Sequence, residues 1–156
     1  HLQRNKVKQV VGHVALIQSV GSLELLDEIE KVAAARGLVQ DILLEVNIGG
    51  EASKSGISPE ELSALAAQAV GSPHVRLRGL MAIPPVAAGP DGNRPFFAKM
   101  RQLYVDIRSQ MDDNKTSFDC LSMGMSGDFE DAVREGATLV RVGTALFGPR
   151  PPMHKG

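Results

Sequence analysis

Five short apolar runs alternate along the chain with segments of helical periodicity. The apolar runs cover residues 14–20, 41–48, 75–83, 118–121 and 138–142. Helical patterns follow the first four runs. Residues 22–37 begin with a Ser and end with a Gly, which suit the two ends of a helix, and residues 58–70 begin with the capping box "SPEE". The other two patterns cover residues 128–135, before Gly136, and the apolar positions Phe96, Met100, Leu103, Tyr104 and Ile107. This alternation predicts a parallel sheet whose strands are connected by helices on its outside.

Two parallel α/β folds fit this rhythm. A five-stranded doubly wound sheet would be complete at this length. A (β/α)8 barrel needs eight strands and about 250 residues, so this chain would supply its last five βα units. The opening segment "LQRNKVKQVV" is helix-like and no initiator Met precedes it, which favours the barrel fragment. The chain also lacks a G-x-G-x-x-G or Walker loop, which counts against a nucleotide-binding doubly wound sheet.

Composition narrows the class of protein further. The chain has 156 residues with 43% hydrophobic and 22% charged residues, as in an ordinary globular domain. A net charge of −1 and the scarcity of aromatic residues argue against nucleic acid as a partner. No apolar run approaches the roughly 20 residues of a membrane span, and Cys120 has no second cysteine to pair with. These features predict a cytoplasmic protein.

Small residues follow the fourth and fifth apolar runs, in "SMGMSGD" and "GTALFG". In (β/α)8 barrels the loops after the last two strands commonly bind a phosphate group. The hydroxyl groups of Ser126 and Thr144 and the backbone amide of Gly143 would be its ligands, with Gly124 and Gly127 allowing close approach. The alternative is that Ser126 caps the helix at 128–135 and that Gly143 only marks a tight turn.

Other candidate residues also lie near expected strand ends. Arg141 lies inside an apolar run, two residues before Gly143, and needs either a carboxylate or an acceptor on a ligand as its partner. Asn47 and Lys54 belong to the loop "NIGGEASKSGI", which is a possible ligand contact or a plain solvated loop. Met81 lies near the end of the third run, and a Met at such a place is more often core than ligand contact. No spacing typical of metal ligands or paired glycosidase carboxylates is present.

Together, "HLQRNK", "VNIGGEASKSGI", "RLRGLMAIPP" and "LSMGMSGDFEDAVREGATLVRVGTALFG" resemble the pyridoxal phosphate homeostasis protein family. The resemblance implies an alanine racemase N-terminal-domain-like barrel that binds pyridoxal 5′-phosphate (PLP). It assigns the phosphate to Ser126, Gly143 and Thr144 and the pyridine nitrogen to Arg141. The remaining expected contacts with the pocket are Asn47, Lys54, Met81 and Met125.

The same resemblance implies that residues 1–156 form a partial PLP-binding barrel domain. The family's Schiff-base Lys lies on a first strand that this chain does not contain, so no catalytic residue is expected here. The implied function is cofactor (vitamin B6) homeostasis without strong catalytic activity, with self-association through exposed barrel edges. Alternatives are a PLP-dependent amino-acid racemase, for which only Tyr104 is available as a second acid or base, and another phosphate-binding barrel enzyme.

Overall fold

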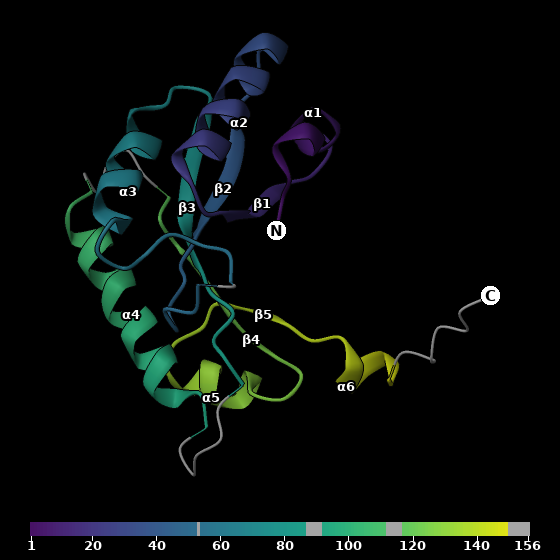
Figure 1. Cartoon of the computed structure of the whole chain (residues 1–156), viewed down its shortest axis with the longest axis vertical. Helices are drawn as coiled ribbons and strands as arrows, with labels where there is room; N and C mark the ends of the chain where they lie inside the picture. The colour runs from purple at the N-terminus through teal and green to yellow at the C-terminus, as the bar shows by residue number, and fades with distance from the viewer. Residues whose placement is uncertain (53, 87–91, 112–116, 150–156) are drawn as a thin grey trace.

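The computed structural model describes residues 1–52, 54–86, 92–111 and 117–149. Its five strands pair in parallel and in sequence order: β1 (Leu16–Val20), β2 (Gln40–Glu45), β3 (Val75–Met81), β4 (Cys120–Met125) and β5 (Leu139–Arg141). A doubly wound sheet would reverse its strand order at one point, and this sheet does not. The fold is therefore a curled parallel half-barrel, as the barrel alternative predicted in outline (Figure 1).

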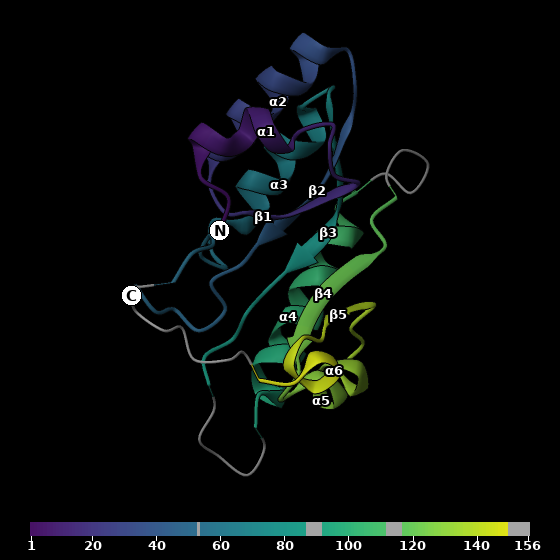
Figure 2. The same ribbon diagram turned by 90° about the vertical axis from the view of Figure 1, so that its right-hand side faces the viewer.

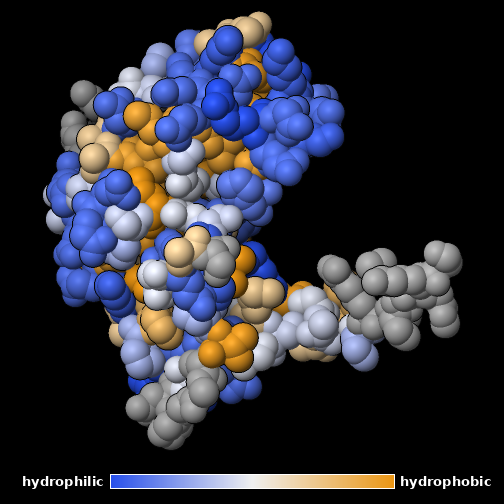
Figure 3. Space-filling view, in the orientation of Figure 1, coloured by the Kyte–Doolittle hydropathy of each residue, from blue (hydrophilic) through white to orange (hydrophobic). Residues whose placement is uncertain are grey.

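The longer helices cover the convex side of the sheet and leave the other side open (Figures 1 and 2). They are α2 (Leu23–Arg36), α3 (Leu62–Gly71), α4 (Arg94–Ser109) and α5 (Phe129–Arg134). Three short helical segments complete the described chain: η1 (Arg4–Lys6), α1 (Val7–Val10) and α6 (Thr144–Phe147). In the space-filling view the outline is hollowed on the open side, between the α1 region and the projecting α6 (Figure 3).

The helix ends show where local signals decide structure. Ser22 accepts a hydrogen bond from the backbone N–H of Leu25 at the start of α2, and Gly37 ends that helix in the left-handed conformation, as predicted. In "SPEE", Ser58 does accept from the N–H of Glu61, but α3 begins only at Leu62. The helix predicted over residues 58–70 therefore starts too early, because the capping hydrogen bonds close a turn that precedes the helix.

The two faces of the sheet differ in what they bury. Alternate strand residues such as Ile42, Leu44 and Leu121 belong to the hydrophobic core under the helices. Their neighbours Leu43 and Met81 are also buried, but they lie outside that core cluster, on the concave face. The curl of the sheet therefore encloses a second, smaller set of buried side chains.

No helix in the described part of the chain is long and apolar enough to cross a membrane.

Candidate functional site

The loops after β4 and β5 meet through the side chain of Ser126. Its Oγ accepts hydrogen bonds from the backbone N–H groups of Gly143, at 3.1 Å, and Ala145, at 3.2 Å. The carboxyl ends of neighbouring parallel strands lie at the same edge, which brings the two small-residue loops together. The expected capping role of Ser126 does not appear, because the N-cap residue of α5 is Asp128.

The glycines of these loops differ in how much space a side chain would have. Gly124 has a φ of +94°, and a Cβ there would lie 2.5 Å from Cβ of Ala132, so α5 packs directly on its backbone. Gly127 and Gly143 have no atom within 4 Å of an added Cβ. Gly143 and Thr144 are exposed at the start of α6, so the hydroxyl group of Thr144 is accessible to a ligand, whereas the N–H of Gly143 is bonded to Ser126 Oγ.

Arg141 finds its partners on the concave face and not in the loops. Its guanidinium donates one hydrogen bond to Oγ of Ser122 and another to the carbonyl oxygen of Ala82, at 2.9 Å. Among the described residues it forms no ion pair, although Asp128 and Glu45 attract it from a distance. Burial lowers the pKa of Arg141, and these two carboxylates oppose that shift.

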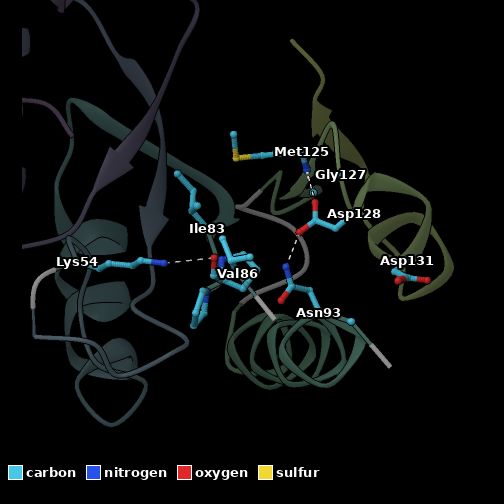
Figure 4. A pocket seen from close by; sticks show the side chains of 12 residues that line it. Lys54, Ile83, Val86, Asn93, Met125, Gly127, Asp128 and Asp131 are labelled. Atoms are coloured by element: carbon cyan, nitrogen blue, oxygen red, sulfur yellow. Dashed lines mark hydrogen bonds between the residues drawn. The ribbon is translucent and has the colours of Figure 1, made fainter. Parts of the chain in front are cut away.

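Lys54 and Met125 line an open cavity of about 490 Å³ at the carboxyl ends of β3 and β4 (Figure 4). Lys54 Nζ lies 2.9 Å from Glu51 Oε2 and 3.4 Å from the carbonyl oxygen of Pro84. On the opposite wall, Asp128 accepts from the N–H of Met125 and from the side-chain amide of Asn93. The cavity thus has an ammonium group on one side and a hydrogen-bonded carboxylate on the other.

The two remaining candidates lie apart from this cavity. Asn47 donates from its side chain to the carbonyl oxygen of Glu51 at 2.8 Å, so in this structure it ties down its own loop. Met81 is 5% exposed at the end of β3, where its register partners are Glu45 on β2 and Ser122 on β4. The candidate residues therefore lie in different places. Ser126, Gly143 and Thr144 belong to the two loops, Arg141 and Met81 to the concave face, and Lys54 and Met125 to the wall of the cavity. No cluster of His, Cys, Asp or Glu in the described ranges could hold a metal ion.

Three polar residues of the concave face were missed in the sequence: Gln18, Glu45 and Ser122. Ser122 donates to Oε1 of Gln18 at 2.7 Å, across the curl of the sheet from β4 to β1. Glu45 is 6% exposed, and burial raises the pKa of its carboxyl group. The available signal was a polar residue inside the apolar runs at Gln18 and Glu45, and a polar residue directly after the fourth run at Ser122.

A curled parallel half-barrel, with helices on its convex side and small-residue loops after β4 and β5, belongs to the class of β/α-barrel proteins. The profile of the family "Alanine racemase, N-terminal domain" matches residues 1–151, and the chain belongs to this family.

Among characterised relatives, the "Pyridoxal phosphate homeostasis protein" of Aquifex aeolicus is 47% identical over 149 residues, which are 96% of this chain and 64% of that protein. The crystal structure of an unknown protein from Bifidobacterium adolescentis has a TM-score of 0.88 at 39% identity, covering 94% of this chain and 58% of the other. PipY of Synechococcus elongatus, with PLP bound, has a TM-score of 0.82 at 34% identity, covering 95% of this chain and 68% of PipY. The resemblance noted in the sequence is confirmed, and the chain spans less than two thirds of the Aquifex relative.

Proposed function

We propose that this chain is the phosphate-binding part of a PLP-binding barrel that serves vitamin B6 homeostasis. The observation that carries the proposal is the convergence of the Gly143 and Ala145 N–H groups on one oxygen acceptor, Ser126 Oγ. A phosphate oxygen is the same kind of acceptor, and backbone amides at the start of a helix suit an anion. The PLP-bound structure of PipY supports the choice of ligand.

The donor set fits both ends of this cofactor. Ser126, Gly143 and Thr144 would hold the phosphate group, and Arg141 would donate a hydrogen bond to the pyridine nitrogen. PLP supplies an aldehyde that condenses with amines and a pyridine ring that withdraws electrons. An Arg partner leaves the ring nitrogen unprotonated, which weakens that withdrawal relative to a site with an acidic partner.

Four further residues would line the pocket in this proposal. Lys54 and Met125 face the same cavity, and Met81 lies next to Ser122 on the concave face. Asn47 would act indirectly, since it holds the loop that carries Lys54.

We also propose that the five strands are the last five of an eight-stranded barrel and that residues 1–156 form a partial domain. In that arrangement the Lys that binds the aldehyde belongs to a preceding strand outside this chain. The absence of strong catalysis is supported by Tyr104, because its hydroxyl is buried in α4 and donates to the carbonyl oxygen of Phe118 at 2.9 Å. It is therefore not presented as a second acid or base.

Two further parts of the proposal concern self-association and the cellular compartment. Within the described sheet β1 pairs only with β2, and β5 only with β4, so both edges offer backbone groups for self-association. The half-buried single thiol of Cys120 suits a reducing cytoplasm.

Equilibrium binding of PLP and of inorganic phosphate tests the site. We expect the double variant Ser126→Ala, Thr144→Ala to weaken both ligands about tenfold or more, since it removes two hydrogen bonds that contribute about 0.5–1.5 kcal/mol each. Ser109→Ala, a hydroxyl at the far end of α4, is the matched control and should leave both affinities unchanged. Equal binding by the double variant and the native chain would disprove the site.

A further inference from the structure

The concave face carries one polar group from each strand or strand end. These groups are the side chains of Gln18, Glu45, Ser122 and Arg141 and the carbonyl oxygen of Ala82, and we call them the polar belt. Four of them form a chain of hydrogen bonds that runs from Gln18 through Ser122 and the guanidinium of Arg141 to the carbonyl oxygen of Ala82. Ser122 is central to this chain, because its hydroxyl donates to Gln18 and accepts from Arg141. The guanidinium is thus held at a fixed place on the face by β4 and by the end of β3.

Glu45 is the fifth member and is placed beside this chain by the strand register. Its Cα partner on β3 is Met81, whose partner on β4 is Ser122, so the three residues form one row across the sheet. Its Oε2 atom is buried and has no hydrogen-bond partner in the described part of the protein. Glu45 and Arg141 attract each other without forming an ion pair at contact distance.

A purely structural role does not explain this carboxylate. A buried carboxylate without a complete set of partners destabilises a folded protein, and an apolar side chain of similar volume would pack better. Burial indeed raises the pKa of Glu45 against the opposing attraction of the amino-terminal ammonium group and Arg141. Perturbed ionisable groups of this kind concentrate at functional sites.

We propose that Glu45 is a positioning residue for Arg141, whose guanidinium its carboxylate directs along the polar belt toward the ring of a bound pyridine ligand. This inference rests on the proposed function for the identity of the ligand, but the coupling between the two side chains does not. Arg141 has spare N–H donors beyond its two hydrogen bonds, since a guanidinium carries five. Burial lowers the pKa of Arg141, and the negative charges of Asp128 and Glu45 oppose this shift.

The coupling can be tested without any ligand. The side-chain N–H signal of Arg141, assigned in nitrogen-15 NMR spectra by its loss in Arg141→Lys, is followed between pH 4 and 8. We expect a step in its chemical shift with a midpoint above 4.5, the ordinary value for Glu, because burial raises the pKa of Glu45. The step should vanish in Glu45→Gln and persist in Asp128→Asn, in a sample with a blocked amino terminus, and in the exposed control Glu60→Gln.

A step of unchanged size in Glu45→Gln, or no step in the native chain, would overturn the proposal. The same spectra also separate a positioning role from a structural one. If Glu45 only filled space, the isosteric Gln would leave the Arg141 signal at its native position at every pH.

Ligand binding then tests the functional half of the proposal. We expect Glu45→Gln to weaken the binding of PLP about tenfold and to leave the binding of inorganic phosphate unchanged, because Arg141 would contact the ring and the loops would contact the phosphate. In the background of Arg141→Lys, Glu45→Gln should have no further effect on PLP, since the two residues act as one unit. Independent, multiplying effects would refute the positioning role. A native chain that binds neither ligand would refute the proposed function, and the NMR titration would still decide the coupling.

Discussion

Replacement of Gly79 by Ala is the sharpest test of the curled sheet. Gly79 lies in β3 at the point where the register with β2 shifts between Ile42 and Leu43. It has a φ of +153°, and its Cα partner on β4 is Cys120. A Cβ at this position would lie 1.7 Å from the carbonyl oxygen of Cys120 and 2.6 Å from its carbonyl carbon. Two neighbouring backbones approach each other here in a way that only glycine permits.

The size of the effect follows from what must move. Ordinary contacts of a Cβ begin at about 3.4 Å, so β3 and β4 would have to separate by well over 1 Å, against atoms that belong to backbone and not to a flexible side chain. Overpacking costs about 1–3 kcal/mol and a disfavoured backbone conformation about 1–3 kcal/mol more. We expect Gly79→Ala to lower the free energy of unfolding by about 3–5 kcal/mol, a large part of the about 5–15 kcal/mol of a typical domain.

The assay is urea unfolding followed by circular dichroism, with Gly71→Ala as the matched control. Gly71 is the last residue of α3, and an added Cβ there meets no atom within 4 Å. Ala favours the helix over Gly by about 0.5–1 kcal/mol, so the same substitution should be neutral or stabilising at this position. A loss below about 1 kcal/mol for Gly79→Ala, with the urea dependence unchanged, would show that β3 and β4 do not approach as described.

Three further predictions concern single side chains. Glu45→Gln should stabilise the chain at pH 7 and not at pH 4. Because burial raises the pKa of Glu45 in the folded state, the native chain loses stability as the pH rises through that pKa, and Gln avoids this loss. Equal effects of the substitution at both pH values in urea unfolding would contradict the prediction. Asp119→Asn should behave oppositely, since the Arg78 hydrogen bond lowers the pKa of Asp119 and stabilises the fold above about pH 4; the loss should be below about 1 kcal/mol for this exposed pair and should shrink as the pH falls below about 4. Tyr104→Phe leaves the buried carbonyl oxygen of Phe118 without its donor and should cost about 1–3 kcal/mol in the same assay, whereas a change within about 0.3 kcal/mol would mean that water replaces the hydroxyl.

The parts of the fold that the sequence predicted correctly depend on local signals. The apolar runs mark all five strands, and α2 begins and ends at the predicted capping residues. The fourth strand was placed too early, because the prediction ended it at Leu121 while β4 runs from Cys120 to Met125. Ser122 and Gly124 read as loop residues in the sequence, yet both are strand residues: Ser122 lies on the concave face, and Gly124 is buried against α5.

The candidate site also has a part that the sequence predicted and a part that it did not. The meeting of the Ser126 and Gly143 loops was predictable, because parallel neighbouring strands end at one edge. The hydrogen bond between Gln18 and Ser122 was not, because it joins residues 104 positions apart and exists only when the sheet curls enough to bring β1 toward β4. Periodicity predicts that a strand has two faces, but it does not say which residues of distant strands share the inside of a bend.

The two faces of the sheet contribute differently to stability and to ligand binding. The convex face contacts the helices through apolar side chains, so its contribution to the free energy of folding comes from the burial of apolar area. The concave face contains a guanidinium and a carboxylate that are both largely buried without an ion pair between them, an arrangement that reduces stability. The core under α2, α3 and α4 must offset that cost. It follows that substitutions in the polar belt should change ligand affinity more than stability, whereas substitutions such as Gly79→Ala, which disturb the curl itself, should change both.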